Sequence, residues 1–234
     1  MQKKDQHNLS SLIWLTEPLE ELSERLTGYN SDYSGKSVVV ELVAVQTVLM
    51  RHLRGYISAP ELKNWASLIY CQKGIELEAI FSRQLEEIFQ FLATPDTNDS
   101  ISPSLCADFL NSLGTNPSDS LIQNLAVRSE IVRVCRMMQS NRIELIYGCR
   151  RLVQLSRSLP ASEQEAFLTF VGVVSECDEY PDDDKKNLFS QSYLESISRA
   201  IRLYESRVER RVLNTCSGII SEFEEHFRET KIQR

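Results

Sequence analysis

The sequence predicts an all-α protein. Apolar residues recur at intervals of three and four along most of the chain, whereas the alternation of apolar and polar residues that marks half-buried strands is almost absent. The chain has 234 residues, of which 42% are hydrophobic and 25% charged, as in a folded protein with a sizeable core. We expect eight or nine helices in two packed halves, residues 1–115 and 116–234, with a long helix at the C-terminus.

Five helices are expected in the first half. They cover about residues 9–26, 36–54, 58–74, 75–93 and 103–113. The second of these is apolar almost all round and should be the buried central helix of its layer, although the run Val38–Val40 also suits a strand. The third has the strongest local signal, because Ser58 and Glu61 form a capping-box pattern and Pro60 suits a first helical turn.

Four helices are expected in the second half, which begins at the helix-start signal Asn116–Pro117. They cover about residues 117–138, 142–159, 160–175 and 190–230. A break at Ser140–Asn141 separates the first two, and an acidic segment follows the third. The last helix is the longest. About forty residues at 1.5 Å per residue span about 60 Å, so we expect it to span both halves or to project.

Composition excludes several classes of function. The net charge of −7 provides no basic excess that would attract nucleic acid. The N-terminal segment lacks the apolar core of a signal peptide. The longest apolar run, residues 37–50, contains Glu41 and Gln46 and is shorter than the roughly 20 residues of a membrane span. We therefore expect a cytoplasmic protein that does not enter a membrane and does not bind nucleic acid.

No strong signature of catalysis, nucleotide binding or metal binding is present. The segment Gly35–Ser37 ends like a phosphate-binding loop but lacks its upstream glycine, and residues 182–187 lack the glycine of a calcium loop. The six cysteines lie far apart, so we expect reduced and mostly buried thiols. The best candidate nucleophile is Cys149 beside Arg150 and Arg151, yet an amphipathic helix would bury it. We expect no cofactor and no enzyme activity.

Two neighbouring segments carry opposite charge. Residues 128–157 contain seven arginines against two acids, and residues 163–184 contain eight acids and no base. The segments could neutralise one another, the acidic one could dock a basic protein, or the arginines could bind an anionic ligand. Our predicted partner-binding residues are the acids Glu176, Asp178, Glu179, Asp182, Asp183 and Asp184.

Two parts of the chain resemble a known group of proteins. Residues 52–66 resemble the "Leu-x-Gly-x-Ile-Ser, then Leu-x-x-Trp-Ala" stretch of small bacterial helical proteins that are similar to toxin-immunity proteins. Residues 148–152 and 175–181 resemble a "Gly-x-Arg-x-Leu … Ser-Glu-Thr-Asp-x-x-Pro" pattern in related proteins, with Cys177 in place of the threonine. The resemblance implies a bacterial, cytosolic, protein-binding molecule without catalytic residues.

Two functions follow as hypotheses. The first is a stoichiometric binding protein, an immunity or antitoxin-like inhibitor whose partner is another protein, such as a basic toxin domain. The alternative is a helical adaptor or regulatory subunit that pairs with a partner through its long C-terminal helix, or self-associates through it as a homo-oligomer.

Overall fold

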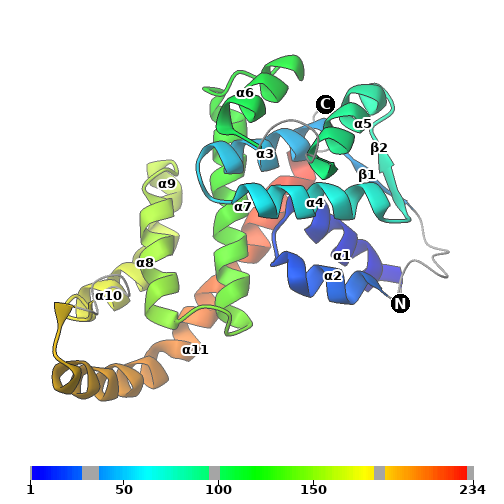
Figure 1. Cartoon of the computed structure of the whole chain (residues 1–234). Coiled ribbons are helices and arrows are strands. Elements are labelled where there is room, and N and C mark those ends of the chain that lie inside the picture. The colour runs from blue at the N-terminus through cyan, green and yellow to red at the C-terminus, as the bar shows by residue number, and fades with distance from the viewer. Residues whose placement is uncertain (1, 28–36, 95–100, 182–187, 231–234) are drawn as a thin grey trace. The chain divides into compact units, whose positions relative to one another are not determined.

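The computed structural model describes residues 2–27, 37–94, 101–181 and 188–230 (Figure 1). These residues form ten α-helices of nine residues or more, two short helical segments and two strands of three residues. The prediction of a mostly helical fold is confirmed, although the described part has more helices than expected and a small sheet. No helix in that part combines the length and the apolar composition that a bilayer crossing requires.

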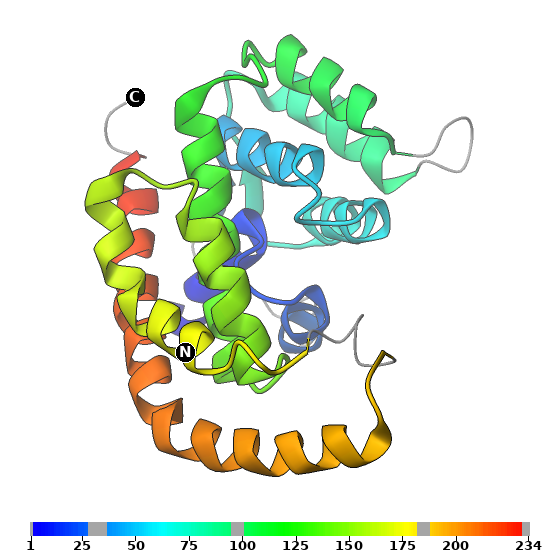
Figure 2. The ribbon, with the colours of Figure 1, turned by 90° about the vertical axis from the view of Figure 1, so that its left-hand side faces the viewer.

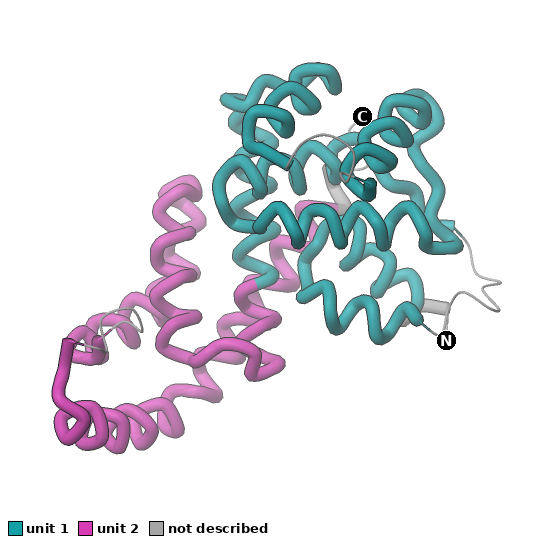
Figure 3. Tube along the Cα trace, viewed as in Figure 1, with its two compact units in different colours: residues 1–133 teal, residues 134–234 magenta. Residues whose placement is uncertain are grey.

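The chain forms two compact units, residues 1–133 (unit 1) and 134–234 (unit 2), coloured separately in Figure 3. The change of unit falls inside helix α7 (Ser120–Gln139). The sequence-based prediction put the boundary before the start of that helix, near Asn116.

Unit 1 contains most of the helices and both strands. Before α7 its elements are α1 (Gln2–Trp14), α2 (Leu19–Thr27), β1 (Val38–Val40), α3 (Leu42–Leu53), α4 (Ala59–Cys71), β2 (Ile75–Leu77), α5 (Ser82–Ala93) and α6 (Pro103–Ser112). Every residue of α3 from Leu42 to His52 is buried, which confirms this helix as the centre of its layer. It packs against α1, α4 and α6, while α5 packs against α4 (Figure 1). The capping box at Ser58 and Glu61 is present as predicted.

The prediction of a single helix over residues 9–26 is wrong, because the chain breaks between α1 and α2. Leu15 adopts a left-handed φ of 48°. The N–H groups of Leu15 and Thr16 donate to the carbonyls of Leu12 and Ser11 at 3.1 and 3.0 Å, the two bonds that close a helix in a Schellman motif. Pro18 then prevents continuation of α1 and suits the start of α2.

Side chains that are distant in sequence stabilise this break. Arg51 of α3 donates from Nη1 to the carbonyl oxygens of Trp14 at 3.2 Å and Leu15 at 2.7 Å. Trp65 of α4 donates from Nε1 to the carbonyl oxygen of Leu12 at 2.8 Å. Because the last carbonyls of a helix lack intrahelical donors, these contacts supply donors to the buried end of α1, where the Trp14 carbonyl also accepts from the Ser129 hydroxyl at 2.9 Å.

Arg51 is also the centre of a buried ion-pair network. Its side chain is 0% exposed and its Nη2 lies 2.6 Å from Oε2 of Glu130, while Nη1 donates to the Ser129 hydroxyl at 3.1 Å. Burial lowers the pKa of Arg51, and the charge of Glu130 opposes this shift. Arg133 extends the network by donating to Glu61 and lying 3.7 Å from Glu130. The network thereby ties α3, α4 and α7 together.

The two strands correct two predicted helix starts. Val38–Val40 pairs in parallel with Ile75–Leu77, so residues 36–54 and 75–93 are not helical from their first residues. The valine run favours extended structure, and Gly74, with a φ of 82°, turns the chain into β2. The two strands lie far apart in the sequence, so their pairing cannot be read from the residues around either one.

Unit 2 consists of the end of α7 and four further helices. They are α8 (Leu145–Ser156), α9 (Ala161–Gln164), α10 (Leu168–Glu176) and α11 (Gln191–Thr230). The break at Ser140–Asn141 is confirmed, with a φ of 55° at Asn141. The helix expected over 160–175 is interrupted by a 3₁₀ turn at Glu165–Phe167. Helix α11 has 40 residues, confirming the long C-terminal helix, and it curves along its length (Figure 2).

The core of unit 2 includes four free thiols. They belong to Cys135 of α7, Cys149 of α8, Cys177 after α10 and Cys216 of α11, and none is more than 2% exposed. The thiols of Cys135 and Cys216 are hydrogen-bonded to each other. Of the six cysteines only Cys71 is exposed, which confirms the prediction of mostly buried, unpaired thiols.

Candidate functional site

The predicted acidic residues lie around the C-terminal end of α10. Glu176 is the last residue of α10, and Asp178 and Glu179 follow in the next turn; all three are exposed. Asp182, Asp183 and Asp184 lie outside the described residues. The part of the predicted site that can be described therefore consists of three carboxylates within four positions of the chain.

The turn that carries Asp178 and Glu179 is anchored on both sides. Arg150 of α8 donates from Nη2 to the backbone carbonyl oxygens of Cys177, at 3.1 Å, and of Tyr180. The Cys177 side chain is buried, which fixes the beginning of the turn in the core. Because its two ends are held, the turn presents both carboxylates to solvent at a fixed place.

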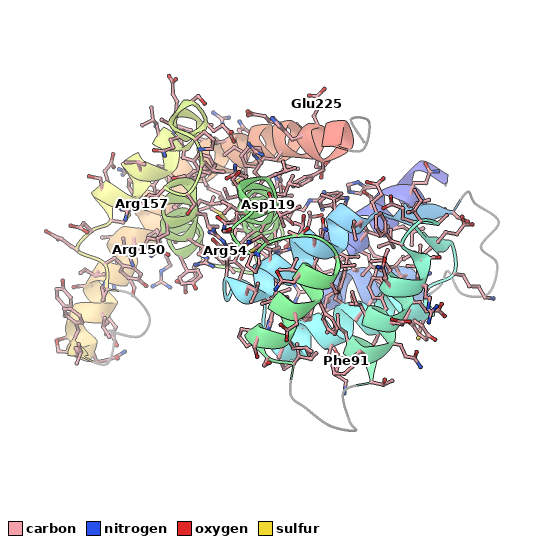
Figure 4. The ribbon with its side chains drawn as sticks, turned by 90° about the horizontal axis from the view of Figure 1, so that it is seen from above. Arg54, Phe91, Asp119, Arg150, Arg157 and Glu225 are labelled. Atoms are coloured by element: carbon pink, nitrogen blue, oxygen red, sulfur yellow. The ribbon has the colours of Figure 1, made fainter. Side chains whose placement is uncertain are left out.

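The turn borders a hollow of about 420 Å³ between α8 and the segment after α10. Its apolar lining includes the half-buried Val153 and Val174 and the buried Pro181. Its exposed charged lining includes Asp178, Glu179 and Arg157. Arg150 within α8 and Arg157 at its C-terminal end, both labelled in Figure 4, line the hollow from this side. Apolar contact area combined with charged residues is the usual composition of a protein interface.

Several arginines of residues 128–157 bind groups other than the carboxylates of this turn. Among the described residues, Asp178 and Glu179 form no ion pair. Arg150 donates to backbone carbonyls, Arg133 donates to Glu61, and Arg136 donates to Glu224. The described contacts thus show no direct ion pair between these arginines and Asp178 or Glu179, although Arg150 and Arg157 line the same hollow.

A second hollow of about 780 Å³ adjoins the first one. It lies between residues 141–145 and the N-terminal half of α11, and Tyr180 lines both hollows. Carboxylates from both of its walls line it, Glu144 from the start of α8 and Glu205 and Glu209 from α11. Sequence reasoning missed this part, because Glu144 and Glu205 lie far apart in the chain and neither belongs to a recognisable motif.

Glu205, which lines this second hollow, and its neighbour Tyr204 in α11 have shifted pKa values. Partial burial raises the pKa of Glu205, the nearby Glu144 raises it further, and a hydrogen bond from the backbone N–H of Ile146 lowers it. Burial raises the pKa of Tyr204 to about 12, and the neighbouring Glu176 carboxylate adds to this shift. Both shifts arise from partial desolvation and nearby negative charge.

The remaining chemical candidates lack the geometry for catalysis. Cys149 is fully buried, and burial with neighbouring thiols raises its pKa to about 12, whereas an activated nucleophile needs a lowered one. His226 places Nδ1 2.9 Å from the backbone carbonyl of Glu222, its neighbour one turn earlier. Within the described ranges no three His, Cys, Asp or Glu side chains are arranged to hold a metal ion.

Comparison with known proteins does not supply a family for this chain. Neither a scan against protein-family models nor searches of curated proteins and of solved structures found a match.

Proposed function

We propose that this chain acts by binding another protein through the surface of unit 2 formed by α8 and residues 174–181, as a cytoplasmic bacterial inhibitor of the immunity or antitoxin type. The observation that carries this proposal is the pair Asp178 and Glu179. Both are exposed, neither forms an ion pair with a described residue, and both border a partly apolar hollow.

The geometry favours a basic partner. Exposed carboxylates that form no ion pair attract a positively charged surface, which speeds encounter and excludes acidic competitors. The apolar lining supplies contact area once the partner has docked. Because Arg150 already holds the turn, little conformational entropy is lost on binding, which favours a tight stoichiometric complex.

Site-specific photo-crosslinking tests where the partner binds. Phe189 lines the hollow and is 42% exposed, whereas Phe91 in unit 1 is 38% exposed and makes an edge contact with Phe109 (Figure 4). Each phenylalanine is replaced in turn by a photoreactive phenylalanine analogue, and the chain is expressed in the source bacterium. We expect one specific crosslinked partner, in one-to-one stoichiometry, from position 189 and not from position 91. Equal crosslinking from both positions, or none from 189, would contradict the proposed surface.

The adaptor hypothesis is favoured by one separate observation. The N-terminal half of α11 leaves Leu203 58% exposed and Tyr193 38% exposed, more apolar surface than a solvated helix needs. Size-exclusion chromatography with light scattering tests it with Leu203→Glu, and Leu168→Glu on α10 is the matched control because Leu168 is 61% exposed. Loss of a dimer in Leu203→Glu alone supports self-association through α11, and a monomeric wild-type chain excludes it.

A further inference from the structure

The N-terminal half of α11 presents a row of arginines to solvent. Arg199, Arg207 and Arg210 are exposed, and Leu203, which is 58% exposed, lies between the first two. Their spacing of four, four and three residues places these four side chains on one face of the helix. Arg211 is also exposed and lies one turn after Arg207. We refer to these five residues as the arginine face of α11.

The other sides of this part of α11 are the ones that pack within unit 2. Val208 and Val212 are buried, and Tyr204 neighbours Glu176 at the end of α10. Glu205 and Glu209 line the hollow of about 780 Å³. The arginine face is therefore directed away from the core of its unit, and Figure 2 shows this half of α11 (orange) at the outer edge of unit 2.

The arginine face lacks a counter-charge of its own. Among the described residues, the side chains of Arg199, Arg207 and Arg210 form no hydrogen bond or ion pair. Arg210 and Arg211 lie one turn after Arg207, and like charges at this spacing destabilise a helix. No acid stands three or four positions from residues 207, 210 or 211 in the sequence. The cluster thus lowers the stability of the helix and gains from negative charge outside the chain.

A second copy of this helix supplies too little negative charge. Glu195, one turn before Arg199, is the nearest acid along the row, and its Oε1 already accepts from Nε2 of Gln191 at 3.0 Å. Pairing of two copies through this face would bring four arginines of each copy against one carboxylate of the other. Charge complementarity therefore favours a different, acidic molecule. The exposed Leu203 at the centre favours a protein over a nucleic acid, because it adds apolar contact area.

We propose that the arginine face of α11 binds an acidic amphipathic helix of another protein, with carboxylates beside Arg199, Arg207 and Arg210 and an apolar side chain against Leu203. A helix laid along α11 repeats its side chains at the same intervals of three and four residues. Guanidinium groups bind carboxylates through paired charge-assisted hydrogen bonds. This surface differs from the docking surface formed by α8 and residues 174–181, so the inference goes beyond the proposed function and does not rest on it.

Two synthetic peptides test the face on the full chain. Both are amphipathic helices of about 15 residues with leucines on one side, and the positions that flank the leucines are glutamates in one peptide and glutamines in the other. Each is titrated into the ¹⁵N-labelled protein. We expect saturable shift changes at residues 203 and 207–211 with the glutamate peptide and at least about tenfold weaker binding of the glutamine peptide. Raising the salt concentration should weaken only the glutamate peptide.

Three variants show which side chains carry the binding. The double variant Arg207→Gln/Arg210→Gln should weaken the glutamate peptide about tenfold, and Leu203→Ala should weaken both peptides. All three positions are exposed, so the remaining amide signals should not move. The control Arg54→Gln/Lys73→Gln removes the same charge from exposed positions of unit 1 (Arg54 in Figure 4) and should leave the affinity unchanged.

Equal binding of the two peptides, or unchanged binding in Arg207→Gln/Arg210→Gln, would overturn the inference. Tighter binding of a single-stranded DNA of about 12 nucleotides than of the glutamate peptide would also overturn it, since the face would then suit nucleic acid. A wild-type dimer that dissociates in Arg207→Gln/Arg210→Gln would show that a second copy covers the face. Crosslinking from position 189 tests the proposed function separately, so either result can fail without the other.

Discussion

Units 1 and 2 use charged side chains in different ways. In unit 1 the fully buried Arg51 is surrounded by acceptors from α1 and α7, and its charge is balanced by Glu130. In unit 2 the thiol-containing core buries no comparable pair among the described residues, and Asp178 and Glu179 stand exposed beside a hollow. A buried charge that is held by several acceptors is part of what determines the fold, whereas an exposed charge without an ion pair is free to serve binding. Substitution of Arg51 should therefore affect stability, and substitution of Asp178 and Glu179 should affect binding.

The largest effect is expected from Arg51→Met. Removal of the guanidinium takes a donor away from Glu130 and from the carbonyls of Trp14 and Leu15, all of them buried, so the free energy of unfolding should fall by about 3–5 kcal/mol. Urea denaturation measures the loss. The exposed Arg54→Met (Figure 4) is the control and should change stability by less than about 0.5 kcal/mol. Equal effects of the two variants would mean that Arg51 does not determine the fold of unit 1.

The packing of unit 2 can be tested at Gly148. A Cβ atom added there would lie 2.4 Å from Sδ and 2.5 Å from Cγ of Met138, so the buried Met138 side chain would have to move. Gly148→Ala should lower the free energy of unfolding by about 1–3 kcal/mol, measured by thermal and urea denaturation. Gly172→Ala on α10 has open space around it and should instead stabilise by about 0.5–1 kcal/mol. Stabilisation by both substitutions would show that α8 does not depend on this close approach.

Alkaline pH should destabilise unit 2 more than unit 1. Burial raises the pKa of the Cys149 thiol from its ordinary value of 9.0 to about 12, so the folded state keeps a proton that the unfolded state has lost. Its contribution to stability is complete below pH 9 and decreases between pH 9 and 12, by up to about 1.4 kcal/mol per pH unit. Hydrogen exchange at pH 8 and 10 measures the change in each unit. Cys149→Ala should reduce the dependence of the stability of unit 2 on pH. An unchanged dependence would show that ionisation of the Cys149 thiol is not its cause.

The smallest effect on folding is expected from the double variant Asp178→Asn/Glu179→Gln. Stability should change by less than about 0.5 kcal/mol, because both side chains are exposed and form no ion pair with a described residue. Binding to the crosslinked partner should nevertheless weaken about five- to thirtyfold at low salt and less at high salt. The double variant Glu86→Gln/Glu225→Gln removes the same charge from exposed positions elsewhere. If both double variants weaken binding equally, the effect depends on the net charge of the chain and not on the position of Asp178 and Glu179.

Local sequence signals predicted those parts of the molecule that local physics controls. The Ser58–Glu61 capping box, the break at Asn141 and the boundaries of α11 depend on residues within one or two turns of the helix. The exposed position of Asp178 and Glu179 belongs to this group, because a base-free acidic segment after a helix is seldom buried.

Only the tertiary structure decided the rest. The break at Leu15 is stabilised by Arg51, the strand at Val38–Val40 by its pairing with Ile75–Leu77, and the second hollow forms where residues 141–145 face α11. In each case the segments that meet lie more than thirty residues apart in the chain. The periodicity of apolar residues determines that a segment becomes helical and which face it buries. Where the helix ends, and which carboxylates come to share one hollow, depends on hydrogen bonds and desolvation that exist only once distant segments have packed together.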